Sequence, residues 1–584
     1  MRQYTFANII NFIFTLCNIY LFISIVFGIL LNVNSYNWDN VENMYFASRI
    51  LYGELPGIRE FYDKFLLVPL LFTVFSYHKT VNSWVATNVV ASFLASWVLS
   101  ATIVQIVRNY SNITISVSTR YFLALFYLYL LSSIQGEFIY INPMAASFYI
   151  FFIYFTVQSE NRTKYTARIR HYFFILASLC SAIVISIRPY YLLSVLFIML
   201  WRVLFYQIFR FTKINKFYFF VVCSRILKTL FYCVFLLTIF FTIFNVFPYI
   251  VLRTTDSLFI SIHMLLLDLK PQVYTETLRD QFSFFGSLNV VVRLFLCIII
   301  FVLLCFTFFN KNMMRKFNMK NINKHLLLFD ILSMSVVPII LLEAVIFSKH
   351  YWPHYMQLFI PNIIILCGMM LCLFVQVGTL NSIEDQILIF FKTFNNNIGM
   401  SILPMKIVNF ICYKISTKKI SKTALYVIAI IWIVFEKNSN NSYIASINRI
   451  MNNEAEFVLL NTIENIRNER RAAGFGGDFL YTSNMFSHWM LNESRHGFPH
   501  ASHFSAISQG WFSNWNPRSV MPGFPTTSDS LCRKITLSGP SIVFVPKDSA
   551  LFECISSRSP ISYSINGMFI DYDGPVAVMF REVF

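Results

Sequence analysis

Apolar runs of about 20 residues recur along this chain, and they constrain its fold more than any other feature. A helix of that length can cross a hydrocarbon layer of about 30 Å. Charged residues make up only 13% of the chain, against about 25% in soluble domains. We therefore predict a polytopic α-helical membrane protein with about 11 transmembrane helices. The predicted spans are 8–32, 82–107, 119–135, 143–158, 171–187, 189–209, 226–248, 289–309, 326–347, 355–378 and 423–436.

One shorter apolar run, 66–77, decides the predicted orientation of these spans. It makes a helix of about 18 Å, which is too short to cross the membrane, so we expect it to lie flat. With the N-terminus in the cytoplasm, the loops rich in Lys and Arg then face the cytoplasm, as the positive-inside rule requires. This distribution explains the net charge of +18 without nucleic acid as a partner.

The predicted transmembrane domain covers 1–436, and 437–584 forms a C-terminal extramembrane domain. The transmembrane domain has two large outer loops, 33–81 and 249–288, and a long cytoplasmic loop, 379–422. The predicted spans place the protein in the cytoplasmic membrane as a multi-pass protein. Its high Phe, Ile, Asn and Lys content is typical of an AT-rich genome, which points to a bacterial source.

The C-terminal domain differs in composition from the rest, with more Gly, Pro, Ser and His. DFLYTS, SIVFVPK and PVAVMFREV are typical of strands and 445–470 is typical of a helix, which predicts a small α/β domain. We expect this domain on the outer, periplasmic side. Cys532 and Cys554 would then lie in an oxidising compartment, where they either form a disulfide or stay free.

No cofactor is expected, and a divalent metal is not indicated. Three histidines of the C-terminal domain have the spacing of metal ligands on a helix, but the intervening Gly497 and Pro499 argue against a regular helix. We therefore predict no metal site there. The three histidines are His496, His500 and His503.

The segment YNWDNVENMYFASRILYGELPGIREFYDK, 36–64, concentrates charges directly after the first apolar run. Charges on the outer side of a membrane do not act as orientation signals, so they need another role. Apolar positions in 41–53 recur at helical spacing, which predicts a helix lying along the interface. The charged residues are Asp39, Glu42, Arg49, Glu54, Arg59, Glu60, Asp63 and Lys64.

This loop resembles that of the GT-C glycosyltransferases that use polyprenyl-phosphate sugars, which include protein O-mannosyltransferases and the lipid A aminoarabinose transferase. Many bacterial members read D-x-x-x-Y-x-x-A-x-x-I-x-x-G-x-x-P-Y-x-D-F-x-D-x-K-x-P-L there. Two departures are that Arg59-Glu60 replaces the usual Tyr-Arg-Asp approach and that FLLV separates Lys64 from the final Pro-Leu. The matching positions are Asp39, Tyr45, Ala47, Ile50 or Leu51, Gly53, Pro56, Phe61, Asp63, Lys64 and Pro69-Leu70.

Three further segments resemble the same family in the same order. GEFIYINP, 136–143, is similar to a short acidic outer loop, and SIRPYYLL, 186–193, is similar to a basic turn between the fifth and sixth spans. KHYWPHYMQLFIPNIIILCG, 349–368, is similar to the H-Y-x-x-Q-L-x-P that opens a late helix. The resemblance implies a GT-C-like transmembrane domain with interfacial helices in the first outer loop.

The resemblance also implies a function: an inverting glycosyltransferase that moves a sugar from a polyprenyl-phosphate carrier to an acceptor hydroxyl at the outer face of the membrane. The acceptor is a lipid, a glycan or a protein. Asp39 is implied as the general base, with Glu42 as the second choice one helical turn away. Alternatively, Asp39 only caps the helix that follows it.

The leaving phosphate needs cationic partners at the membrane surface. For Arg188, an ion pair with Glu137 or Asp39 is the alternative, and for Lys349 and His350 the alternative is that they only snorkel at the interface. The phosphate-binding candidates are Lys64, Arg59, Arg188, Lys349, His350 and His354, and the other site candidates are Tyr45, Asp63, Glu137 and Tyr355.

Two other functions fit an apolar chain of this kind: a lipid-linked sugar flippase or transporter, and a surface-polysaccharide polymerase or ligase. A transporter typically places ionisable residues at mid-membrane depth. Here the predicted spans are nearly free of charge away from their ends, and the acidic residues cluster at one surface. This distribution favours chemistry on a lipid headgroup.

Overall fold

The structure is a computed structural model. It describes residues 15–26, 29, 43, 46–47, 50, 65–75, 81–110, 115, 117–132, 141–161, 164–199, 216–251, 357–366, 368–369, 454–475, 479–481, 527–538, 540–557, 563–571 and 574–582.

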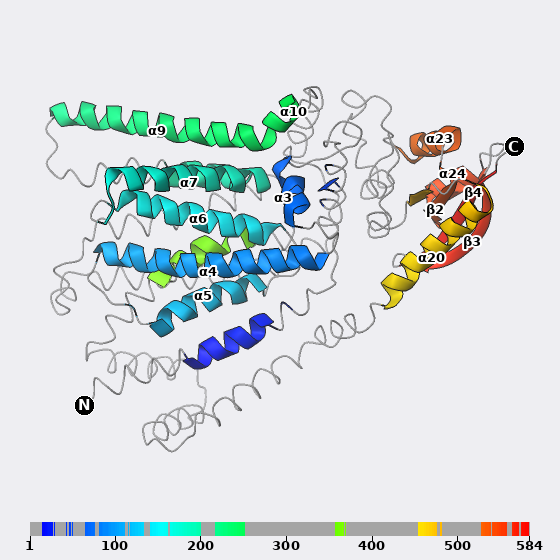
Figure 1. The fold of residues 1–584 in the computed structure, drawn as a ribbon, viewed down its shortest axis with the longest axis horizontal. Helices are drawn as coiled ribbons and strands as arrows, with labels where there is room; N and C mark the ends of the chain where they lie inside the picture. The colour runs from blue at the N-terminus through cyan, green and yellow to red at the C-terminus, as the bar shows by residue number, and fades with distance from the viewer. Residues whose placement is uncertain are drawn as a thin grey trace, which may run out of the picture.

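The N-terminal part of the described chain is helical, and its long helices lie side by side (Figure 1). Contacts join α5 to α4, α4 to α6, α6 to α7 and α7 to α9, so α6 lies between α4 and α7. Further helical segments occupy 15–26, 191–199 and 360–366. The helices are α3 (Leu67–Phe75), α4 (Val81–Tyr110), α5 (Val117–Ser132), α6 (Asn142–Glu160), α7 (Ala167–Ile187), α9 (Lys216–Asn245) and α10 (Phe247–Val251).

The prediction of about 11 transmembrane helices is wrong for the part of the chain that the structure describes. Only two helices there are long and apolar enough to cross a membrane, Ser83–Arg108 and Ala167–Ile187. The shorter apolar helical stretches are Thr15–Val26, Val117–Leu131 within α5, and Leu230–Asn245 within α9.

The excess in the prediction has a physical cause, because a span needs a long uninterrupted apolar helix and not only a run of apolar letters. The 16 residues of α5 make a helix of about 24 Å, which falls short of the hydrocarbon thickness. The 19 residues of α6 begin with Asn-Pro and end with Gln-Ser-Glu, so its apolar stretch is shorter than the helix. Three predicted spans, 289–309, 326–347 and 423–436, lie outside the described residues.

The run 66–77 forms the short helix α3, whose nine residues make about 13 Å. Its apolar side is packed inside the structure, since Val68 and Phe72 are fully buried. The Phe72 ring stacks on Trp84 of α4 with centroids 3.7 Å apart. This contact fixes α3 across the start of α4.

Two of the long helices carry rows of large apolar side chains that remain exposed. On α4 the row comprises Val90, Leu94 and Trp97, spaced four and three residues apart, so they share one helix face. On α9, Phe231 is 74% exposed and Phe235 is 50% exposed. Water is a poor environment for such surfaces.

The C-terminal part forms a four-stranded sheet in the order β1-β2-β4-β3. The pair β1–β2 is parallel, and the pairs β2–β4 and β4–β3 are antiparallel. The elements are α20 (Glu454–Ala472), β1 (Phe479–Tyr481), α23 (Ser528–Ser538), β2 (Ile542–Pro546), α24 (Ala550–Ser557), β3 (Tyr563–Asp571) and β4 (Gly574–Arg581).

Alternation along β2 sends its apolar side chains to both faces of the sheet. Ile542 and Phe544 are buried with Ile463 of α20, while Val543 and Val545 belong to the core that includes Leu551 of α24. The sheet is therefore covered by α20 on one face and by α24 on the other.

The sequence predicted three of these four strands. DFLYTS contains β1, SIVFVPK contains β2, PVAVMFREV covers β4 except for its first residue, and the helix predicted at 445–470 overlaps α20. Strand β3 was missed. Its pairing with β4 runs from Tyr563 opposite Arg581 to Asp571 opposite Gly574.

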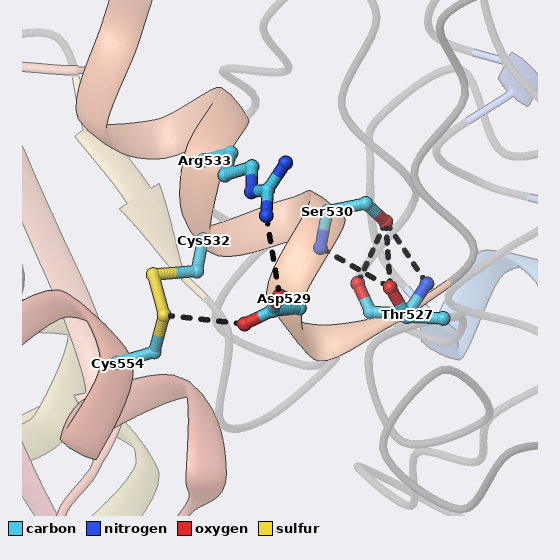
Figure 2. A network of polar contacts seen from close by, with 6 residues as sticks. All are labelled: Thr527, Asp529, Ser530, Cys532, Arg533 and Cys554. Atoms are coloured by element: carbon cyan, nitrogen blue, oxygen red, sulfur yellow. Dashed lines mark hydrogen bonds and ion pairs between the residues drawn. A yellow bond between two sulfur atoms is a disulfide. The ribbon is translucent and has the colours of Figure 1, made fainter.

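The disulfide left open by the sequence is formed: Cys532 of α23 is bonded to Cys554 of α24, with their Cα atoms 6.2 Å apart (Figure 2). The start of α23 is held by a reciprocal cap, in which the Ser530 N–H donates to Thr527 Oγ1 and the Thr527 N–H donates to Ser530 Oγ. Asp529 lies beside the disulfide and forms an exposed ion pair of 3.8 Å with Arg533. The bridge fastens the two helices to each other.

Candidate polar site at one end of the helices

Buried polar side chains gather where α6 begins and where α7 and α9 end. We call this group the polar end and define it by Asn142, Ser186, Arg188 and Asn245. Each of these residues is at most 6% exposed. Helices α3 and α10 lie at the same end of the long helices, on the right in Figure 1. Side chains of this kind are stable inside a protein only when they are hydrogen-bonded.

Arg188 is the charged member of the polar end. It is the C-cap of α7, where its backbone N–H still donates to the Val184 carbonyl at 2.8 Å. The helix ends there because Pro189 follows, and a residue before proline is disfavoured in the helical conformation. Its Nε donates to Oδ1 of Asn142 at 2.5 Å. The local sequence thus ends the helix at the arginine, and α6 orients its guanidinium.

Asn245 forms the second polar link. Its Nδ2 donates to Ser186 Oγ at 2.7 Å, which joins the end of α9 to the end of α7. Its Oδ1 accepts from the backbone N–H of Leu67 at 3.2 Å, which joins α9 to the start of α3. The Asn245 amide therefore links α9, α7 and α3. Its partner on α7, Ser186, lies two residues before Arg188.

Two buried tyrosines extend the site to the segment 357–366. The Tyr149 hydroxyl of α6 donates to Asn362 Oδ1 at 3.1 Å, and the Tyr191 hydroxyl donates to the Leu358 carbonyl at 3.0 Å. The two rings lie against each other with centroids 4.5 Å apart. Gln357, which precedes this carbonyl, is also fully buried.

Ala47 and Ile50 of the first predicted outer loop reach the same region. Thr73 Oγ1 of α3 lies 3.3 Å from the Ala47 carbonyl and 2.9 Å from the Pro69 carbonyl. Ile50 packs against the buried pair of Leu66 and Tyr249. Helix α3 therefore connects this loop to the polar end.

Four segments that are distant in the sequence thus meet. GEFIYINP supplies Asn142, SIRPYYLL supplies Arg188 and Tyr191, and KHYWPHYMQLFIP supplies Leu358. The first outer loop joins them through α3 and Asn245. These are the four segments on which the family resemblance was based. Chemically, the arrangement offers a fixed guanidinium, which binds anions such as phosphate and carboxylate.

Of the predicted site residues, the structure describes Arg188 alone. The others lie outside the described residues, so their predicted roles stay predictions. They are Asp39, Glu42, Tyr45, Arg59, Asp63, Lys64, Glu137, Lys349, His350, His354 and Tyr355.

Sequence reasoning missed Asn142 and Asn245, because an asparagine beside a helix end is usually an ordinary cap or turn residue. The order of the motifs was the one available signal for Asn142, since it lies within GEFIYINP. For metals, the described residues hold no group of three or more His, Cys, Asp or Glu side chains able to bind an ion. Comparison of the chain with protein-family models, with curated proteins and with solved structures finds no match.

Proposed function

We propose that this chain is a membrane glycosyltransferase that moves a sugar from a polyprenyl-phosphate carrier to an acceptor hydroxyl. The observation that carries the proposal is the meeting of GEFIYINP, SIRPYYLL and the segment after KHYWPHYM around Arg188, through the Arg188–Asn142 and Tyr191–Leu358 hydrogen bonds. Segments that resemble one enzyme family need not be neighbours in space. Their contact supports a shared site.

In this proposal Arg188 binds the phosphate of the donor. A guanidinium carries five N–H donors, and the bond from Nε to Asn142 uses one of them. That bond also fixes the plane of the guanidinium, which matters because arginine and phosphate pair in a planar, two-point geometry. Positive charge at this position stabilises the phosphate as it leaves. Lys64, Arg59, Lys349, His350 and His354 remain further candidates for the same role.

The reaction has one proton transfer and one substitution. The Asp39 carboxylate takes the proton of the acceptor hydroxyl, with Glu42 as the second choice for this base. The acceptor oxygen attacks the anomeric carbon, and the bond from that carbon to the phosphate oxygen breaks. Polyprenyl phosphate leaves with the electron pair, and the configuration at the anomeric carbon is inverted.

The surface of the helices supports a membrane location. Val90, Leu94 and Trp97 on α4 and Phe231 and Phe235 on α9 turn outward, which suits contact with lipid. The Cys532–Cys554 disulfide suits an oxidising compartment. We therefore place the C-terminal domain and the polar end on the outer side of the cytoplasmic membrane.

Mass spectrometry of glycolipids and envelope glycans in cells tests the proposal. The strains carry the intact gene, a deletion, Arg188→Gln, Asp39→Asn or Arg168→Gln. Arg168 is the matched control, because it is an exposed arginine in the first turn of the same helix. We expect the deletion to lose one sugar modification, which the intact gene and Arg168→Gln restore.

Arg188→Gln and Asp39→Asn should each restore at most about 1% of the modification, as expected when a charge-stabilising group or a general base is removed. Full restoration by Asp39→Asn would remove Asp39 as the base. A deletion strain with an unchanged glycan and glycolipid profile would refute the proposed function.

A further inference from the structure

Helix α3 begins in a sequence that offers it no local cap. Lys64, Phe65 and Leu66 precede it, and none of them is among the Ser, Thr, Asp and Asn residues that cap helix starts. The first N–H groups of any helix need acceptors from outside the helix. Here the Val68 N–H donates to the Phe65 carbonyl at 3.0 Å, and residue 69 is proline, which has no N–H. The N–H of Leu67 is the one that the local chain does not satisfy.

Asn245 supplies the acceptor from 178 residues away. Its Oδ1 accepts from the Leu67 N–H at 3.2 Å in a buried position. Its Nδ2 is held by Ser186 Oγ at 2.7 Å and by the Phe241 carbonyl at 3.1 Å. The side chain is therefore fixed from the α7 and α9 sides before it meets α3. The Phe65 ring adds an edge-on contact with Phe241, with centroids 4.9 Å apart.

We propose that Asn245 is a positioning residue: it caps α3 from another helix and thereby holds the first outer loop in register with Arg188. The link continues through α3, because Thr73 Oγ1 contacts the Ala47 carbonyl and Ile50 packs on Leu66. Ala47 follows Asp39 by eight residues in the sequence. The catalytic part of this inference rests on the proposed function, in which the loop carries the base and Arg188 binds the leaving group.

Five variants of the full chain are purified in phospholipid nanodiscs. One is Arg188→Gln, and the other four separate the link from Asn245 to α7 from the link to α3. Asn245→Leu removes the hydrogen bonds to Leu67 and to Ser186. Asn245→Asp keeps an acceptor for the Leu67 N–H, and Ser186→Ala removes the hydrogen bond to α7 alone. Thr238→Val is the matched control, since it deletes an exposed hydroxyl two turns earlier on α9. Three measurements are made: hydrogen exchange of the peptide that contains α3, binding of polyprenyl phosphate, and turnover of the sugar donor that the cell experiment identifies.

We expect α3 to exchange faster in Asn245→Leu alone. Turnover in that variant should fall about tenfold, while the dissociation constant for polyprenyl phosphate stays within about twofold, because misplacing a catalytic group by a fraction of an ångström lowers kcat more than binding. Arg188→Gln should show the opposite split, with weaker polyprenyl phosphate binding and unchanged exchange of α3. Asn245→Asp should keep α3 protected, since an anionic acceptor suits a helix start.

Unchanged exchange of α3 in Asn245→Leu would overturn the cap, and faster exchange with full turnover would overturn the positioning role. If Asn245→Leu does not fold, faster exchange of α3 in Asn245→Asp than in Ser186→Ala overturns the cap. A wild-type chain that neither binds polyprenyl phosphate nor turns over the donor refutes the proposed function, and the exchange measurement still decides the cap.

Discussion

The two ends of the helices use polar residues in opposite ways. At the polar end, Asn142, Ser186, Arg188 and Asn245 are buried and bonded to partners 46 to 178 residues away. At the other end Arg108, Lys164 and Arg168 are exposed, and we call these three the basic end. Two of them contact residues close in the sequence: Arg168 Nε donates to the Tyr172 hydroxyl at 3.3 Å, and Lys164 lies over the adjacent Tyr165 ring.

This difference separates residues that can orient a protein in a membrane from residues that can bind a ligand. Exposed Lys and Arg residues in short loops are sufficient to orient a membrane protein, and they need no partners. A buried arginine that is bonded across helices is costly to build, because desolvation of a charge costs several kcal/mol. Such a group is expected where a ligand or another helix requires it. The comparison therefore identifies the polar end as the place to look for function.

The largest expected difference concerns the side of the membrane: we expect the polar end and the C-terminal domain outside the cell and the basic end inside it. In intact cells, with the other native cysteines replaced, a maleimide that does not cross membranes should label the partly exposed Cys554 after an impermeant reductant is added. Lys164→Cys, at the basic end, should stay unlabelled until the membrane is opened. Labelling of Lys164→Cys in intact cells would place both ends differently and remove the outer-face site.

The second contrast is in stability. Asn142→Leu leaves the buried Nε of Arg188 without its acceptor, so we expect the free energy of unfolding to fall by about 2–4 kcal/mol. Lys164→Gln, at the basic end, should stay within about 0.5 kcal/mol of wild type, as exposed substitutions do. Thermal unfolding in detergent measures both. Equal stabilities for the two variants would mean that the Arg188–Asn142 bond contributes nothing to the fold.

The polar end also shows how far sequence alone can reach. The helix end at Arg188 could be predicted, because Pro189 follows it and a residue before proline is disfavoured in the helical conformation. The roles of Asn142 and Asn245 could not, since burial and partners more than 40 residues away leave no local trace. The number of spans failed for a related reason: apolar letters give composition, whereas helix length is set by where polar ends and prolines interrupt each run. Strands β1, β2 and β4 were predictable because their apolar stretches are short and rich in β-branched or aromatic residues.

A smaller contrast concerns three tyrosines, two of them buried and one exposed. Tyr149→Phe and Tyr191→Phe each remove one buried hydroxyl and strand its acceptor, Asn362 Oδ1 or the Leu358 carbonyl. Each should lower the free energy of unfolding by about 1–2 kcal/mol. Tyr172→Phe, whose hydroxyl meets exposed Arg168, is the matched control at the basic end and should cost less than about 0.5 kcal/mol. A Tyr172→Phe cost equal to that of the buried pair would show that hydroxyl burial is not what distinguishes the two ends.

The smallest expected effect is a pH dependence at the basic end. Hydrogen bonding to the Tyr165 side chain raises the pKa of Lys164 above its usual value. A raised folded-state pKa gives stability that is fully present below the unfolded-state pKa and is lost as the pH rises through the folded-state value. The loss therefore falls in the alkaline range, and the exposure of Lys164 keeps it small because solvent screens the interaction. Tyr165→Phe should return the pKa of Lys164 toward its ordinary value, which NMR of a labelled lysine would detect. The same variant should leave the polar end unchanged, because Tyr165 and Lys164 are neighbours in the sequence, and any shift in Arg188 or Asn142 signals would show that the two ends are coupled through α7.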